Sequence, residues 1–408
     1  MTDGPLIRTL LPIAAGAFLL RLSYALAFAP DIEGFGDDLF FHLTALQLVD
    51  GHGYVESFDV FSGREPDATA AHPPGYVVAL SLVGQLGGRS VDAMRIVGVG
   101  AGTVTVVAVG LIAGRLAGRR AAIVAAAICA VYPAFIAADT ALMSETLFGA
   151  LVACAVLLAL VLLDRPSVAG MAGLGVLVGL SVLTRSEGLL LVPLLAVPLL
   201  APAPGRRLRL AAPFVVTAAL VVAPWVVRNT RAFDRPLLTT NEGTTLMGAN
   251  CDKTYYGDEV GGFTATCLTP SPPGETPGET NDRRRSEAFT YVRAHRGRAV
   301  VVAGARLLRT VGFYDIEEGA RLQGRERGLQ TAGIVAFYPL LLAGIAGAVA
   351  LFRRRQRLAL AVVLAPIAVS ILTAAATYGL IRVRHVAEVS LVALAGVALA
   401  RVRRRSPQ

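Results

Sequence analysis

Two adjacent aspartates, Asp37 and Asp38, follow the first long apolar segment, in the stretch GFGDDLFFHLTALQLVDGHGY. The apolar residues after the pair recur at helical spacing, so one carboxylate could serve as a helix N-cap and the second would remain. Neighbouring carboxylates repel, which raises the pKa of one of them and suits a general base near neutral pH. His42 lies on the same helical face as Asp38 and could hold a carboxylate. The pair indicates proton abstraction, with capping as the structural alternative.

Two further polar residues lie where apolar segments begin. His72 precedes Pro73 and Pro74 in AAHPPGY. The prolines fit the start of a helix, and an imidazolium beside them could face an anion. Glu145, in DTALMSETLF, lies about one turn inside the next apolar helix, which is deeper than a helix cap requires.

Arginines gather at the same ends of the apolar segments, several with an acidic neighbour such as Asp92, Glu187 or Glu388. They are Arg95, Arg185, Arg228, Arg382 and Arg384. Cations collected at one membrane edge can bind a lipid-linked phosphate or pyrophosphate. A carboxylate that takes a hydroxyl proton, beside cations that stabilise a departing phosphate, predicts glycosyl transfer from a polyprenyl-phosphate sugar.

Long apolar helices must position these residues. The chain has 408 residues, of which 54% are hydrophobic and 16% charged, against about 25% charged residues in soluble domains. The mean hydropathy is +0.61. We therefore predict an all-α polytopic membrane protein with about ten transmembrane helices of about 17–23 residues each. The predicted spans are 7–29, 91–114, 121–138, 141–163, 168–184, 187–203, 209–228, 331–352, 357–378 and 382–402.

The arginine clusters between these spans fall on one side, which the positive-inside rule makes cytoplasmic together with both termini. The prediction is a multi-pass protein of the plasma (inner) membrane with an extracytoplasmic acidic pair. A cleaved signal peptide is the alternative for the first segment, although its apolar stretch exceeds the ~7–15 residues of a signal core. The net charge of +9 comes from arginines beside apolar runs. This pattern indicates membrane topology, and we expect no nucleic-acid partner.

The topology divides the chain into three parts. Residues 1–228 form the membrane catalytic core with a first outer loop, 30–90; residues 229–330 form a second outer loop; and residues 331–408 form the last spans. The apolar segment 76–86 is too short to span and predicts an interfacial or re-entrant helix. In the second loop, EAFTYVRAHRGRAVVVAGARLLRTVGFY predicts an amphipathic interfacial helix, or else a helix packed on the loop. Cys251 and Cys267 share this loop, where an oxidising compartment permits a disulfide.

Five stretches, in order, resemble the GT-C glycosyltransferases, especially bacterial relatives of protein O-mannosyltransferases and aminoarabinose transferases. They are GDDLFFHLTALQLVDGHGY, AAHPPGYVVALSL, RLAGRRAAIVAAAICAVYPAFIAADTALMSETLF, VVAPWVVRNTRAFDRPLLTTNEGTTLMGAN and IRVRHVAEVSLVAL. The resemblance implies the GT-C architecture, with Asp37 as the base and Asp38 supporting it. Glu145 matches a second acidic position that in some relatives helps to hold a divalent metal. His72 stands where some relatives carry a lysine facing the donor phosphate, and His385 follows Arg384 where relatives often have tyrosine.

The expected activity is a hexosyl- or pentosyltransferase of cell-envelope glycan or glycoconjugate synthesis, working with inversion on the outer face. The donor would be a polyprenyl-phosphate sugar, and the acceptor a hydroxyl of a glycan, lipid or protein. We expect the donor phosphate at His72, Arg185 and Arg384, with His42, Glu187 and Arg228 in support. A metal bound by these carboxylates would be a hard cation, Mg or Mn.

Two other functions remain open. A transporter or flippase of lipid-linked sugars would use the same arginines and need no base. It should show broken helices or charges deep in the spans, where the sequence offers few besides Arg21. A non-catalytic membrane component of envelope assembly is the third interpretation.

Overall fold

The computed structural model describes residues 4–32, 34, 36–63, 66–202, 204–314 and 326–400. Within these ranges the regular structure is helical, apart from one antiparallel bridge between Val55 and Ala68. The predicted all-α class is confirmed.

Six helical segments of the described chain are long and apolar enough to cross a membrane. A seventh candidate consists of α6 and α7, which are bent by 56° at the break before Pro133, where the proline ring cannot continue the preceding helix. The long helices are α1 (Gly4–Ala27), α5 (Ile96–Ala117) with the short α4 (Val91–Met94) before it, α8 (Glu145–Asp164), α11 (Arg207–Phe233), α17 (Arg327–Arg353) and α18 (Arg357–Ala376); the bent pair is α6 (Arg119–Val131) and α7 (Pro133–Thr140).

The remaining three predicted spans are shorter helices. They are α9 (Val168–Thr184), α10 (Leu191–Leu200) after the 3-10 turn η2 (Ser186–Leu190), and α19 (His385–Leu399). Residues His385 to Val397 of α19 are all buried. A helix that is apolar on every side is expected to lie inside a bundle, and α19 packs against α17, α18, α5, α6 and α8. All ten predicted segments are thus helical, while the count of ten spans stays a prediction.

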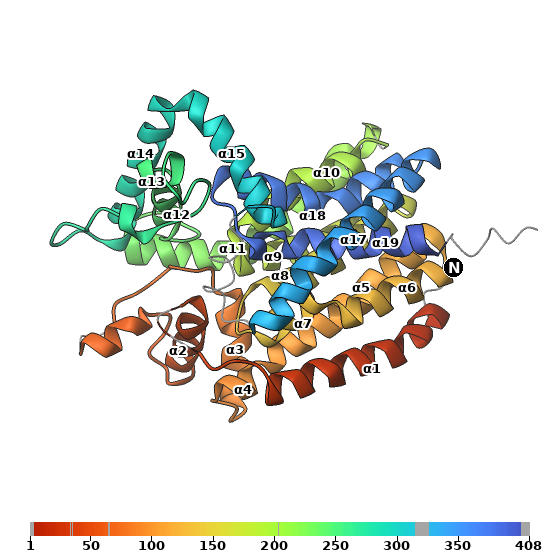
Figure 1. The fold of residues 1–408 in the computed structure, drawn as a ribbon, viewed down its shortest axis with the longest axis horizontal. Coiled ribbons are helices and arrows are strands. Elements are labelled where there is room, and N and C mark those ends of the chain that lie inside the picture. The colour runs from red at the N-terminus through yellow and green to blue at the C-terminus, as the bar shows by residue number, and fades with distance from the viewer. Residues whose placement is uncertain are drawn as a thin grey trace, which may run out of the picture.

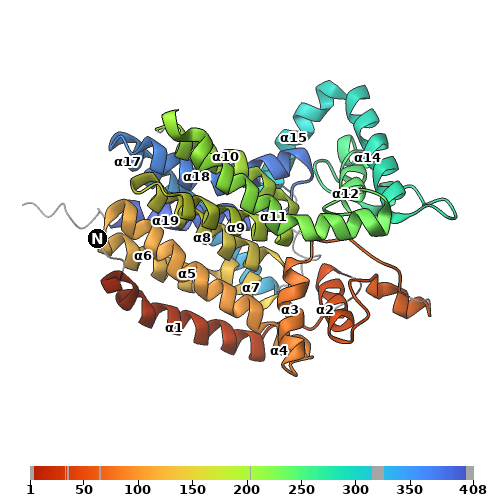
Figure 2. The ribbon, with the colours of Figure 1, turned by 180° about the vertical axis from the view of Figure 1, so that it is seen from behind.

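Both long loops lie at one end of the bundle, away from the N-terminus (Figures 1 and 2). The first loop contributes α2 (Asp37–Val49), the turn η1 (Ser57–Ser62) and α3 (Gly75–Gln85). The second contributes α12 (Glu242–Ala249), α13 (Asp252–Tyr255), the turn η4 (Ala265–Cys267), α14 (Pro277–Ala294) and α15 (Arg296–Val311). Helix α3 runs across the direction of the long helices, as expected for a helix that does not span (Figures 1 and 2).

Arg228 links the first loop to the bundle by hydrogen bonds. It lies near the end of α11 and donates from Nη1 to the carbonyl of Thr69 and from Nη2 to the carbonyl of Tyr54, each over 2.6 Å. Its guanidinium also lies 5.1 Å from the centre of the Trp225 ring. These contacts add to an apolar cluster in which Phe40 and Phe41 of the loop pack with Trp225 of α11, so the loop and the bundle share one core.

Candidate active site

Asp37 is the first residue of α2, yet its carboxylate faces other elements instead of its own helix end. Its Oδ2 accepts from Nη1 of Arg382 over 2.8 Å, and its Oδ1 lies 3.5 Å from Nε2 of His72. The side chain is 32% exposed. Asp38 instead contacts the start of its own helix, where its Oδ1 accepts a hydrogen bond from the backbone N–H of Leu39 over 2.9 Å. The two aspartates are therefore separated in role by where they point.

The two carboxyl groups are also separated in acidity. Burial alone would raise the pKa of Asp37, but Arg382 above all, and His72 beside it, hold that pKa well below its usual value. Burial raises the pKa of Asp38, and the negative charge of Asp37 raises it further. The sequence predicted that repulsion would raise the pKa of one aspartate of the pair, and that aspartate is Asp38. Asp37 remains ionised at neutral pH.

His72 is held in place by aromatic rings and by its own backbone. Its ring lies 5.1 Å from that of Phe40 and 4.9 Å from that of Phe41, centre to centre. Its carbonyl accepts from the hydroxyl of Tyr54 over 2.9 Å. The two phenylalanines follow the acidic pair in α2, so the same helix presents Asp37 and positions the imidazole beside it.

A chain of charges extends from Asp37 toward α8 and α9. Nε of Arg382 lies 3.7 Å from Oε1 of Glu145, the first residue of α8. The same oxygen lies 2.9 Å from Nη1 of Arg185, whose Nε in turn lies 2.5 Å from Oε1 of Glu187. A narrow pocket is lined by Glu145, Arg185, Glu187, Arg382, Phe148, Val383, His385 and Val386. Predicted site residues from four separate segments thus meet at the loop end of the bundle.

The arginine that completes this cluster is Arg382, which was not among the predicted phosphate ligands. Arg384, the predicted phosphate ligand, points elsewhere: its Nε lies 2.8 Å from Oε1 of Glu388, and these side chains are only 3% and 2% exposed. Its guanidinium lies 3.9 Å from the centre of the Phe337 ring. In the tight 3-10 turn η5 (Ile381–Arg384), residues two apart face different directions, so only one arginine can reach Asp37.

Two supporting residues have other contacts than expected. Nδ1 of His42 lies 3.4 Å from Sδ of Met94, whereas the expected contact was with a carboxylate of the acidic pair. Asp38 turns to its own helix end, which leaves His42 to pack toward α4. Arg228 supports the first loop, as described above. The second loop contains the Cys251–Cys267 disulfide.

The carboxylates of the site do not form a metal centre in the described residues. No group of three or more His, Cys, Asp or Glu side chains there could hold an ion. Asp37 and Glu145 each face an arginine, so a divalent metal at either carboxylate would compete with that arginine for its oxygens.

Comparison with solved structures gives the architecture. The apo oligosaccharyltransferase of Archaeoglobus fulgidus matches over 98% of this chain and 50% of its own, with a TM-score of 0.55 and 14% identity. The same enzyme in complex with Zn and sulfate matches over 97% of this chain and 48% of its own, with a TM-score of 0.52 and 16% identity. This chain has the GT-C fold. It spans about half the length of the archaeal enzyme.

Two weaker comparisons accompany this result. The family model of dolichyl-phosphate-mannose-protein mannosyltransferases matches residues 71–228 of the GT-C chain. ArnT from Cupriavidus metallidurans bound to undecaprenyl phosphate matches over 98% of the chain and 79% of its own, with a TM-score of 0.46 and 15% identity. No curated protein matches the sequence. The family match covers His72, Glu145 and Arg185, whereas Asp37 and Arg382 lie outside it.

Proposed function

We propose that the chain is a membrane glycosyltransferase that moves a sugar from a polyprenyl-phosphate donor to an acceptor hydroxyl. The observation that carries the proposal is the carboxylate of Asp37, held between Arg382 and His72 at the loop end of a GT-C bundle. We assign that end to the extracytoplasmic face of the plasma membrane, because the arginine-rich connections 115–120 and 353–357 follow α5 and α17 at the opposite ends of their spans.

Asp37 is the proposed general base. It would take the proton of the acceptor hydroxyl while that oxygen attacks the anomeric carbon. The bond from this carbon to the phosphate oxygen breaks, and the phosphate leaves with the electron pair. One base and one departing phosphate suffice for a single displacement, which inverts the configuration at the anomeric carbon. The sugar would be a hexose or pentose, and its acceptor a glycan, lipid or protein of the cell envelope.

The contact with Arg382 makes the basicity of Asp37 depend on whether the donor is bound. A carboxylate whose pKa is held low is a weak base, because basicity falls with the pKa of the conjugate acid. A donor phosphate that draws Arg382 toward itself would weaken the contact with Asp37. The pKa of Asp37 would then rise, and its basicity would increase when the donor is in place.

The phosphate itself would meet Arg382, Arg185 and His72. In the structure Arg185 is held by Glu145 and Glu187, so its guanidinium is already oriented before a ligand arrives. Fixed cations of this kind stabilise charge that develops on a leaving phosphate. A metal at Glu145 would have to displace Arg185 from Oε1. We therefore assign to Glu145 the role of orienting Arg185 and Arg382.

The transporter hypothesis rests on broken helices or charges inside the spans, and the bent pair α6 and α7 shows both. Nε of Arg21 lies 2.6 Å from Oδ2 of Asp139, and this pair is buried. The remaining donors of Arg21 bond to the carbonyls of Ala17, Cys129 and Ala130, so the pair fastens α1 to α6 and α7. Such closed contacts favour a structural role over a path for a substrate.

A donor-cleavage assay tests the proposal. Purified protein would be mixed with polyprenyl-phosphate [14C]mannose and, separately, a labelled pentose donor, together with an envelope extract as the source of acceptor. We expect release of free polyprenyl phosphate and label in acceptor material with at least one donor. A variant with both Arg185→Gln and Arg382→Gln should release none, whereas Arg89→Gln, which removes an exposed contact to Asp50, should match the wild type. Intact donors throughout would contradict the enzyme and favour a transporter.

A further inference from the structure

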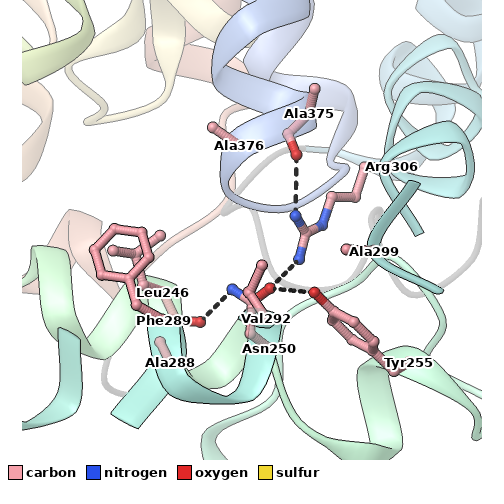
Figure 3. Close-up of a pocket in the computed structure, with 10 residues that line it drawn as sticks. All are labelled: Leu246, Asn250, Tyr255, Ala288, Phe289, Val292, Ala299, Arg306, Ala375 and Ala376. Carbon is pink, nitrogen blue, oxygen red and sulfur yellow. Dashed lines mark hydrogen bonds between the residues drawn. The ribbon is translucent and has the colours of Figure 1, made fainter. Parts of the chain in front are cut away.

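A cavity of about 270 Å³ lies between the second loop and the end of a membrane helix (Figure 3). Its walls come from α12, α13, α14, α15 and α18, together with Asn250. The lining residues include Asn250, Tyr255, Phe289, Ala299, Arg306 and Ala375. None of these residues belongs to the proposed active site, so this cavity is a separate feature of the molecule.

The walls are apolar apart from three residues whose polar groups largely satisfy one another. The hydroxyl of Tyr255 donates to Oδ1 of Asn250 over 2.8 Å, and Nδ2 of Asn250 donates to the carbonyl of Leu246 over 2.7 Å (Figure 3). A sugar would need free donors and acceptors in the wall. The cavity therefore fits an apolar guest.

Arg306 gives the cavity a positive charge. The residue is only 4% exposed, and its guanidinium donates to the carbonyls of Ala375 and Ala249 and to Oδ1 of Asn250. Within the described part of the chain its Nε has no hydrogen-bond partner, and Arg306 forms no ion pair with a carboxylate. The two carbonyls end α18 and α12 and supply only partial negative charge. A cation so placed in apolar surroundings favours an anionic guest.

The position of the cavity identifies the source of that guest. Ala375 and Ala376 are the last residues of α18, a candidate membrane span, so one wall lies where the apolar layer ends. On α15, beside the wall residue Ala299, the side chains of Val300 and Val301 are 75% and 55% exposed. Apolar side chains in this position suit contact with lipid. Pockets that enclose a whole small molecule have volumes of about 300–1,000 Å³. This cavity is slightly smaller, so it suits part of one lipid chain.

We propose that this cavity binds one acyl chain of an anionic phospholipid from the surrounding membrane, with Arg306 as the cation that favours its phosphate. The site is independent of the glycosyltransferase proposal. The proposed donor also combines a phosphate with a long apolar chain, and the test below separates the two lipids.

Tryptophan fluorescence gives a direct test with the full-length protein in detergent. Phe289→Trp places a reporter in the cavity wall, and quenching beyond that of the native Trp225 in the unmodified protein would be followed with phosphatidylglycerol brominated in its acyl chains. We expect saturable quenching, weaker with brominated phosphatidylcholine. Val300→Trp, on the exposed face of α15, should show only linear quenching. Linear quenching of both reporters would overturn the proposal.

Further variants test the cavity and its charge in the Phe289→Trp background. Ala299→Phe, which fills the cavity, should abolish saturable quenching, whereas Ala294→Phe, an exposed control, should retain it. Arg306→Gln should weaken phosphatidylglycerol binding roughly tenfold, as expected for one lost charge-assisted contact, and Arg306→Lys should restore part of it. Saturable quenching that survives Ala299→Phe would overturn the site. Displacement of phosphatidylglycerol by equimolar undecaprenyl phosphate would assign the cavity to the donor chain and overturn the phospholipid.

Discussion

Nη1 of Arg382 lies 2.8 Å from Oδ2 of Asp37 and joins residues 345 positions apart. Asp37 begins α2 in the first long loop, and Arg382 lies in the turn that precedes the last described helix. The contact therefore connects the two ends of the chain at the proposed active site. In our account it keeps the base ionised before the donor arrives.

The pH dependence of transfer should reveal this contact. Arg382 lowers the pKa of Asp37 and burial raises it, so Arg382→Gln should raise that pKa. A general base works only when deprotonated. The residual rate of Arg382→Gln should therefore fall, on the acid side, at a higher pH than the wild-type rate. The measurement is kcat/KM from about pH 4 to pH 8 around the ordinary carboxyl range. Arg89→Gln is the control, and coinciding acid limbs for wild type and Arg382→Gln would refute the coupling.

Arg185 and Arg384 should respond differently to the same substitution. Arg384→Gln leaves the buried Glu388 without its arginine, which typically costs about 3–5 kcal/mol of stability. Arg185→Gln should weaken binding of undecaprenyl phosphate with a smaller change in melting temperature. Thermal unfolding and lipid binding, measured on both variants, separate the two roles. An Arg384→Gln protein with unchanged melting and lost phosphate binding would restore the original assignment.

Trp225 reports whether the first loop is attached. It is the single tryptophan, is 7% exposed and lies under the Arg228 guanidinium. Arg228→Gln removes the hydrogen bonds to Thr69 and Tyr54, so the loop should loosen and the emission of Trp225 should shift to longer wavelength. Arg231→Gln, an exposed arginine on the same helix, should leave the spectrum unchanged. An unshifted spectrum in Arg228→Gln would show that the loop is held by other contacts.

The disulfide predicts the pattern of thiol labelling. Under denaturing, non-reducing conditions, Cys129 and Cys154 should react and Cys251 and Cys267 should not. Replacing both bridged cysteines by serine should make the second loop easier to cleave with protease, because a loop of about 15 residues loses roughly 3 kcal/mol of closure stabilisation. Labelling of all four cysteines without reductant would exclude the bridge.

The apolar helices could be predicted from sequence because each depends on its own hydrophobic run. The end of α19 nearest the site could not. The apolar pattern placed this span from 382, yet the helix begins at His385 because Ile381 to Arg384 form a separate turn. Such a turn is set by the groups that it contacts, and these lie far away in the sequence.

The same limit applies to the partners of the site residues. Asp37 and Arg382 were both recognisable as unusual charges, but no local pattern pairs residues 345 positions apart. Arg384 and Glu388 did carry a local signal, since residues four apart share a helix face and can form an ion pair. For His42 the local signal was misleading. Helical spacing places it near Asp38, but the side chain of Asp38 bonds to the backbone of Leu39. The spacing of residues along a helix determines which face they share, but it does not determine which partner each side chain contacts.

The most direct test compares three aspartates on α2 and its C-cap in single-turnover release of polyprenyl phosphate. Asp37→Asn should bind undecaprenyl phosphate and lower the transfer rate by about 10²–10⁴-fold, the usual effect of losing a general base. Asp38→Asn loses only a local contact to the helix end and should keep measurable turnover, and Asp50→Asn, at an exposed ion pair, should match the wild type. An Asp37→Asn protein that transfers sugar at the wild-type rate, or faster than Asp38→Asn, would contradict the assignment of Asp37 as the base.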